Sequence, residues 1–233
     1  MVAILVDTAI EAEIEIDTLI IGGGAAGLTA ALAACEAGSS VLIAERETVL
    51  SGSTALSSGL IPAAGTAIQL EQSIEDTADI FYSDIMAKNK NKADPDYVRR
   101  IVTQIPKTID WLTAAHNIPF IVLDNFLYPS HTNHRMHAVP EVTGSGLIER
   151  LEVAVRAQDI TIVTDLQITD LVVTAQGEAL GAYCQRPDGS QESIATRSII
   201  LACNGYGGNP ELVAQYIPEM HDALYFGHPG NQG

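Results

Sequence analysis

One stretch of the sequence decides the fold: Thr18-Leu19-Ile20-Ile21-Gly22-Gly23-Gly24-Ala25-Ala26-Gly27. Its first four residues are apolar and mostly β-branched, as in a short strand that is buried on both faces of a sheet. The alanine-rich segment 28–37 follows the glycines and ends at Gly38, which is typical of a helix with a glycine stop. A second apolar run, 41–45, predicts the next buried strand. Strand, glycine turn, helix and strand therefore occupy residues 16–45, the length of one βαβ unit.

The glycines are spaced as G-x-G-x-x-G, which binds a dinucleotide pyrophosphate when a strand precedes the pattern and a helix follows it. Gly22 makes the tight turn, Gly24 lets the backbone approach the phosphates, and Gly27 lets the helix pack on the strand. The positive N-terminal end of that helix then faces the phosphates. Glu45 stands 21 residues after Gly24, where a carboxylate accepts hydrogen bonds from the ribose hydroxyls and disfavours NADP. The alternative is a glycine-rich turn that holds no ligand.

The rest of the chain alternates between loops, helices and short strands. Residues 51–66 are rich in Ser, Gly, Ala and Thr and predict a loop with a short helix. Asp94 and Pro95 mark a helix start, and Pro106 should kink or restart that helix. Further helices are expected at residues 74–87 and 146–158, and strands at 160–164, 167–174, 181–186, 192–196 and 198–202.

Composition narrows the classes of partner. The chain has 233 residues and a net charge of −17, which disfavours nucleic acids and anionic membranes. A nucleotide cofactor remains compatible with that charge because backbone N–H groups can hold its phosphates. Cys35, Cys184 and Cys203 form no C-x-x-C pair, as expected in a reducing compartment. The sequence has neither a secretory leader pattern nor an apolar run of membrane-spanning length, so we expect a cytoplasmic protein that acts on a small molecule.

With these residues in view, the whole chain resembles the flavoprotein family of fumarate reductases, succinate dehydrogenases and 3-ketosteroid dehydrogenases. Its glycine spacing and Glu45 are similar to the FAD fingerprint of that family. The segment 51–59, Ser-Gly-Ser-Thr-Ala-Leu-Ser-Ser-Gly, resembles the family's second cofactor loop, which follows the βαβ unit and approaches the flavin and the pyrophosphate. Residues 199–205 resemble a later strand that ends in Ala-Thr-Gly-Gly, written here Ala202-Cys203-Asn204-Gly205. Ile168 stands where a backbone group holds the adenine.

The resemblance implies an α/β, Rossmann-like fold of the glutathione-reductase type, with a parallel central sheet and an added antiparallel β element. It also implies FAD as the cofactor. Succinate dehydrogenases carry a flavin-linked histidine where this chain has Ser53, so the resemblance implies non-covalent binding. The cofactor-binding residues it assigns are Gly22, Gly24, Ala26, Gly27, Glu45, Arg46, Ser53, Thr54, Ser58, Gly59, Ile168, Ala202, Cys203, Asn204 and Gly205.

The family's members run to several hundred residues, and this chain stops at Gly233 inside another flavin-facing motif. We therefore expect one FAD-binding domain over 1–233 and no capping domain, so the catalytic acid and base remain unknown. The expected parts are a leader (1–13), the βαβ unit and flavin loop (14–66), a helical and loop insertion (67–145), and a helix, β element and final strand (146–233).

Three functions remain open. The first is an FAD-dependent oxidoreductase of the fumarate reductase type, which moves hydride between flavin N5 and an activated C–C bond of a carboxylate or ketone. The second is a non-catalytic FAD-binding fragment or subunit that a complementing C-terminal chain completes. The third is an NAD-binding dehydrogenase domain, which Glu45 fits equally well. Residues 51–59 and 199–205 favour FAD, because a simple NAD domain has no use for them.

A histidine-rich loop leaves further alternatives. His131, His134 and His137 recur at intervals of three residues around Arg135. Imidazoles can ligate zinc, although only Glu141 nearby could complete a ligand set. The loop could instead face an active-site cleft, or simply be packed or solvated. Tyr128 fits either a proton donor or a packed side chain.

Overall fold

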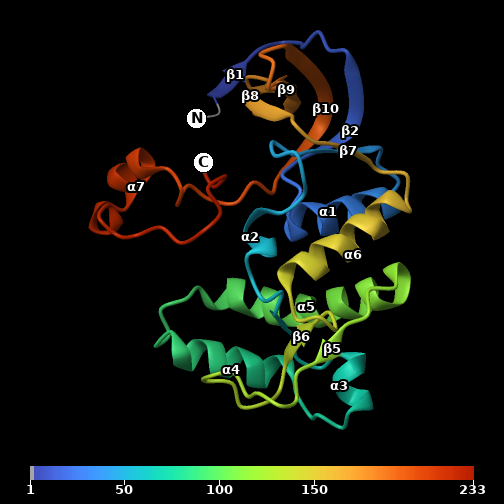
Figure 1. Cartoon of the computed structure of the whole chain (residues 1–233), viewed down its shortest axis with the longest axis vertical. Coiled ribbons are helices and arrows are strands. Elements are labelled where there is room, and N and C mark those ends of the chain that lie inside the picture. The colour runs from blue at the N-terminus through green and yellow to red at the C-terminus, as the bar shows by residue number, and fades with distance from the viewer. Residues whose placement is uncertain (1–2) are drawn as a thin grey trace. The chain divides into compact units, whose positions relative to one another are not determined.

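The computed structural model describes residues 3–233, which form two compact units. The first unit contains residues 3–56 and 148–233, and the second contains residues 57–147 (Figure 1). The second unit includes the segment that the sequence sets apart as a helical and loop insertion. Within residues 3–233, no helix combines the length and apolar character that crossing a membrane requires.

A seven-stranded sheet organises the first unit, in the order β1-β8-β9-β10-β2-β3-β7. The strands β10, β2, β3 and β7 are parallel, β8 and β9 join them as an antiparallel element, and β1 pairs in parallel with β8. This arrangement confirms the predicted fold class. The strand bounds are β1 Ala3–Val6, β2 Ile14–Ile21, β3 Val41–Ala44, β7 Thr161–Val163, β8 Gln167–Val173, β9 Ala179–Gln185 and β10 Gln191–Leu201.

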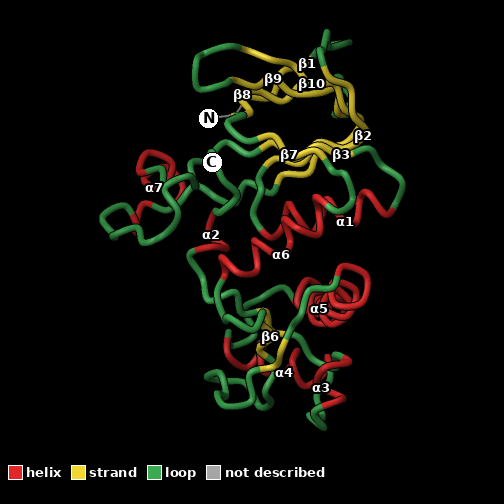
Figure 2. The backbone as a smooth tube through the Cα atoms, turned by 45° about the vertical axis from the view of Figure 1, so that its right-hand side comes forward, coloured by secondary structure: helices red, strands yellow, loops and turns green. Residues whose placement is uncertain are grey.

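Helix α1 (Ala25–Glu36) connects β2 to β3 and packs against both strands (Figure 2). Its contact with the sheet is apolar: Leu28 and Leu32 are fully buried, as are Ile20 and Ile43 on the two strands. The helix ends before Gly38, which adopts the left-handed conformation (φ +86°) that favours glycine. The βαβ unit predicted from residues 16–45 is therefore confirmed.

The strands of the structure differ from the expected ones in two places. The sequence predicts separate strands at 192–196 and 198–202, whereas β10 runs through Arg197 without a break. The Arg197 side chain faces solvent and forms an ion pair with Asp17 of β2, so a polar residue stands in an unbroken strand. The predicted leader likewise contains a strand, since Ala3–Val6 pairs with β8. Both differences concern pairing between segments that lie far apart in sequence.

The second unit combines helices with a three-stranded antiparallel sheet in the order β4-β6-β5. Its strands are β4 Ile61–Pro62, β5 Ile121–Val122 and β6 Met136–Ala138, and its helices are α3 Ala67–Glu71, α4 Ala78–Lys88 and α5 Pro95–His116. The remaining helices of the chain are α2 Gly52–Ala55, α6 Gly144–Arg156, α7 Pro210–Tyr216 and the 3₁₀ turn Pro218–Met220.

Helix α5 begins as predicted, and the helix continues past Pro106 without a restart. Asp94 caps it by accepting hydrogen bonds from the amides of Asp96 (2.9 Å) and Tyr97 (3.1 Å). The helix does not restart at Pro106 but continues to His116. Proline removes one backbone donor, and the buried face of this amphipathic helix compensates for the loss. The buried side chains on that face are Val98, Val102, Ile109 and Leu112.

Arg135 is the buried charge of the second unit, and its side chain is 0% exposed. Its guanidinium binds Asp76 through two contacts, Nε to Oδ2 at 2.8 Å and Nη2 to Oδ1 at 3.0 Å. Its Nη1 donates to Asp84 Oδ2 at 2.7 Å, and its Cζ lies 4.6 Å from the centre of the Phe81 ring. The sequence left open whether this loop binds zinc, faces an active-site cleft, or is packed or solvated. For Arg135, the structure shows a packed side chain.

The histidines of the same loop also have packing partners. His137 is fully buried, with Nδ1 donating to the Arg135 carbonyl (3.0 Å) and Nε2 accepting from the Thr66 hydroxyl (2.8 Å). The His131 ring packs edge-to-face against Phe81 and at a tilt against Tyr128. In the part of the chain that the structure describes, no group of three or more His, Cys, Asp or Glu residues is arranged to hold a metal ion.

Replacing Arg135 by methionine should lower the free energy of unfolding by about 3–5 kcal/mol, because it leaves the Asp76 carboxylate buried without its cation. The matched control is Arg99→Met, which breaks an exposed pair with Asp79 and should cost less than about 1 kcal/mol. Urea unfolding can be followed by Trp111, the single tryptophan, which lies on α5 in the same unit. Equal losses in the two variants would contradict the role given to Arg135.

Burial lowers the pKa of His137, which favours the neutral ring. A depressed folded-state pKa gives stability that is complete above the unfolded value, about 6.5, and is lost as pH falls below it. We therefore expect the urea midpoint to fall between about pH 6.5 and pH 5, and His137→Gln to reduce that slope. Burial also lowers the pKa of His131, which therefore contributes a slope of the same sign. An unchanged slope in the variant would show that His137 does not titrate during unfolding.

Candidate functional site

The parallel strands β10, β2 and β3 have their carboxyl ends side by side in the sheet. The residues predicted to bind a dinucleotide come directly after these carboxyl ends. In the registers of β10 with β2 and of β2 with β3, Leu201 pairs with Ile21 and Ile21 with Ala44. Gly22, Glu45 and Ala202 come next along the three strands. Strand β2 leads to its neighbour β3 through α1, while β10 flanks it on the other side. In open α/β sheets, ligands bind beyond the carboxyl ends of the strands at such a switch point.

Two of the glycines are required by the protein itself. Gly22 has φ +109°, and a Cβ placed on it would lie 2.6 Å from the carbonyl oxygen of Ala202. A Cβ on Gly27 would overlap the carbonyl oxygen of Gly22. Any side chain at either position would therefore push apart the end of β10, the turn and the start of α1.

Gly24 differs, because the residues that the structure describes leave the space around it largely open. Its φ is −75°, which any residue can adopt, and a Cβ placed there would meet only the Thr54 hydroxyl oxygen, at 3.7 Å. Gly24 is also the N-cap residue of α1 and offers that helix no side-chain acceptor. The Ala25 amide donates to Thr54 Oγ1 (3.2 Å), and Ala26 is exposed at the same turn. An open backbone at an uncapped helix N-terminus fits the approach of a phosphate.

Glu45 holds the turn in place through both of its carboxylate oxygens. Oε2 accepts a hydrogen bond from the Gly23 amide (2.7 Å), and Oε1 accepts one from the Glu47 amide (2.9 Å). Each oxygen has a further lone pair that can accept from a ligand hydroxyl. Arg46 is occupied within the protein, since its Nη2 donates to the Gly230 carbonyl (2.7 Å) and contacts Glu47 (3.3 Å). The ligand-binding role predicted for Arg46 remains a prediction.

The second loop meets the end of β10 through Ser53. The Ser53 hydroxyl oxygen accepts from Asn204 Nδ2 (2.8 Å) and from Asn231 Nδ2 (3.0 Å). Cys203 and Gly205, beside Asn204, are exposed. Sequence reasoning did not find Asn231, because no motif marks a residue that is brought there by the fold of the chain after β10.

Three predicted residues are not part of this cluster. Ser58 and Gly59 belong to the second unit, where Gly59 has φ +66° and a Cβ on it would lie 2.8 Å from the Thr143 carbonyl oxygen. The side chain of Ile168 is buried in the core with Leu42, so only its backbone can face a ligand. The cofactor contacts predicted for these residues remain predictions.

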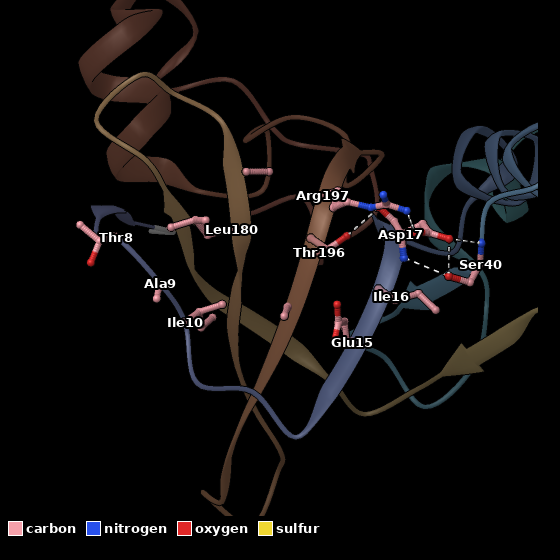
Figure 3. Close-up of a pocket in the computed structure, with 12 residues that line it drawn as sticks. Thr8, Ala9, Ile10, Glu15, Ile16, Asp17, Ser40, Leu180, Thr196 and Arg197 are labelled. Carbon is pink, nitrogen blue, oxygen red and sulfur yellow. Dashed lines mark hydrogen bonds and ion pairs between the residues drawn. The ribbon is translucent and has the colours of Figure 1, made fainter.

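A surface groove of about 780 Å³ lies near the other end of β2 (Figure 3). Its polar groups bind one another: the Ser40 hydroxyl donates to Asp17 Oδ2 (2.7 Å), and Arg197 pairs with the same carboxylate. Hydrogen bonds from Ser40 and the contact with Arg197 hold the pKa of Asp17 well below its usual range. Asp17 precedes Gly22 by five residues, or about 17 Å of strand, so the groove is separate from the glycine turn.

Comparison with known proteins agrees with this geometry. NADH:fumarate oxidoreductase of Klebsiella pneumoniae (strain 342) is 27% identical over 217 residues, which are 93% of this chain and 23% of that protein. A flavocytochrome c3 fumarate reductase, solved in its open conformation, superposes with a TM-score of 0.85 at 26% identity and covers 95% of this chain and 39% of its own. The 3-ketosteroid-Δ4-(5α)-dehydrogenase of Rhodococcus jostii RHA1 also gives a TM-score of 0.85, at 20% identity, and shares the fold over 100% of this chain and 55% of its own.

The fold and the glycine turn define a dinucleotide-binding flavoprotein domain. The chain belongs to the family described as FAD binding domain, whose profile matches residues 17–233. FAD is therefore the dinucleotide, and the alternative of an NAD domain is set aside. The chain spans 23% and 39% of the lengths of the two fumarate reductases named above.

Gly24 and Gly27 allow a matched pair of variants. Gly24→Ala should cost less than about 1 kcal/mol of stability, yet weaken FAD binding about tenfold or more, because its methyl group fills the space left for the phosphates. Gly27→Ala should cost about 1–3 kcal/mol through overpacking. Thermal unfolding of the apoprotein and quenching of FAD fluorescence measure the two effects. Tight FAD binding by Gly24→Ala would contradict the phosphate assignment.

Proposed function

We propose that this chain binds FAD without a covalent link and serves flavin-dependent oxidoreduction of the fumarate reductase type. The proposed substrate is a small carboxylate or ketone with an activated C–C bond. The observation that carries the proposal is the open backbone at Gly24, at the uncapped N-terminus of α1, in a chain that matches the FAD-binding family. Fumarate reductases among the relatives support the reaction class.

The residues of the first unit have distinct parts in this proposal. The first-turn amides of α1, beyond Gly24, hold the pyrophosphate, and Thr54 fixes the start of that turn through Ala25. Glu45 accepts the ribose hydroxyls while its bond to Gly23 keeps the turn rigid. When bound, FAD supplies the hydride-transfer chemistry at N5 of its isoalloxazine ring.

The identity of residue 53 supports the proposal of non-covalent attachment. In the resemblance to succinate dehydrogenases, this position carries the histidine that bonds to the flavin, and a serine hydroxyl forms no such link. The Ser53 hydroxyl is bonded to Asn204 Nδ2.

The purified holoprotein should be yellow, and acid precipitation should release its flavin into the supernatant without proteolysis. The absorbance of supernatant and pellet near the flavin maxima measures the distribution. Flavin that stays with the precipitated protein would contradict non-covalent binding, and a colourless protein that takes up no added FAD would contradict the proposal as a whole.

A second candidate is an FAD-binding chain that needs a partner to react. The observation in its favour is that the chain spans 23% of the length of NADH:fumarate oxidoreductase. Dye-linked reduction of fumarate, or oxidation of a 3-ketosteroid, distinguishes the two. Turnover by the yellow protein alone supports the catalytic proposal, whereas bound FAD without turnover favours the partner-dependent chain.

A further inference from the structure

The segment that follows β10 carries the most exposed large apolar side chains of residues 3–233. Phe226 is fully exposed and Leu224 is 98% exposed, and other exposed apolar residues precede them closely in sequence. A single exposed apolar side chain is ordinary, whereas several in one short stretch indicate a surface that another molecule covers. The apolar tip, as we call this group, consists of Tyr216, Ile217, Met220, Leu224 and Phe226.

The apolar tip stands on a loop whose two ends are bonded to each other. The Gly208 amide donates to the Asn231 carbonyl (2.8 Å), and Gln232 Nε2 donates to the Gly208 carbonyl (2.9 Å). Residues 209–231 therefore leave the sheet of the first unit as one closed loop, which includes α7 and projects away from the strands (Figures 1 and 2). A surface that is already folded loses little conformational freedom when a partner binds to it.

The charged residues around the apolar tip are all negative. Glu211, Glu219 and Asp222 are exposed on the same loop. Residues 198–233 contain no Lys or Arg, so no such cation of this segment offsets the three carboxylates. An apolar centre with a polar rim is the usual composition of a protein–protein interface.

Charge distinguishes among the molecules that could cover the apolar tip. In a symmetric dimer, a second copy would place its own Glu219 and Asp222 against the same two residues of the first, and like charges across an interface are unfavourable. An anionic membrane would be repelled for the same reason. A polypeptide that carries Lys or Arg beside an apolar face would instead complement both the apolar tip and its rim.

We propose that the loop 209–231 is a docking surface for an amphipathic segment of a partner protein. The apolar face of that segment covers Leu224 and Phe226, and its flanking Lys or Arg residues pair with Glu219 and Asp222. The loop contains none of the residues assigned to the dinucleotide, so the inference does not depend on FAD binding. It also gives the partner-dependent candidate a surface at which a partner can bind.

Fluorescence anisotropy of three labelled peptides tests the proposal with the purified chain. The first is an amphipathic peptide of Leu and Lys, the second has Glu in place of Lys, and the third has Ser in place of Leu. Because the surface combines apolar contact with negative charge, the Leu–Lys peptide should bind at least about tenfold more tightly than either of the others. Comparable binding of the Leu–Glu or the Ser–Lys peptide would overturn the inference.

A matched pair of double variants assigns the binding to the apolar tip. Leu224→Ser with Phe226→Ser should weaken binding of the Leu–Lys peptide about tenfold or more, because both apolar contacts are lost. Leu70→Ser with Val153→Ser is the control and should bind as the wild type does, since these side chains are also exposed (80% and 65%) but lie outside the loop. Both double variants should keep the wild-type thermal midpoint. Full affinity in the first variant would contradict the proposed surface.

Two further measurements test the other occupants. Sedimentation velocity over a range of protein concentrations detects self-association, and flotation with phosphatidylcholine vesicles detects membrane binding. We expect neither. Self-association or vesicle binding that is abolished by Leu224→Ser with Phe226→Ser would assign the apolar tip to a second copy or to a membrane, and would overturn the inference.

Discussion

The candidate site depends on the junction between Gly22 and the end of β10, where the backbone at Ala202 leaves no room for a side chain on Gly22. This junction joins the end of β10 to the turn after β2, with the Ala202 amide bonded to the Ile21 carbonyl at 2.8 Å. Glu45 joins the end of β3 to the same turn through Gly23. Because all three strands are parallel and end in register, these bonds place a helix N-terminus, a carboxylate and the second loop around one stretch of open backbone.

Much of the fold could be predicted, because its determinants are local. The apolar run of β2, the glycine stop at Gly38 and the cap at Asp94 act within a few residues of themselves. The differences from the prediction arose where contacts between segments far apart in sequence determine the secondary structure. Strand β1 exists through its pairing with β8, and β10 continues through Arg197 because β2 runs alongside it. Helix α5 does not restart at Pro106, and its buried face packs within the second unit on both sides of that residue.

The same distinction applies to the site. Glu45 and Thr54 both bond to the glycine turn, and their spacing along one βαβ unit and the loop after it could be read from the sequence, whereas their roles toward FAD stay predictions. Asn231 could not be found this way, because its contact with Ser53 spans 178 positions of sequence. Arg46 was predicted to bind the ligand because it stands beside Glu45 in sequence. In the fold, the Arg46 side chain instead donates to the Gly230 carbonyl. Spacing predicts which backbone a dinucleotide would approach, and the tertiary fold determines which side chains surround that backbone.

The most direct test of the central claim is to follow the backbone amide signals of the isotope-labelled apoprotein by NMR during titration with FAD. The account predicts that the largest shift changes fall on the amides of Gly24, Ala26 and Gly27, where the pyrophosphate meets the first turn of α1. Changes centred instead on the groove at Asp17 and Arg197, with the glycine turn unaffected, would contradict it.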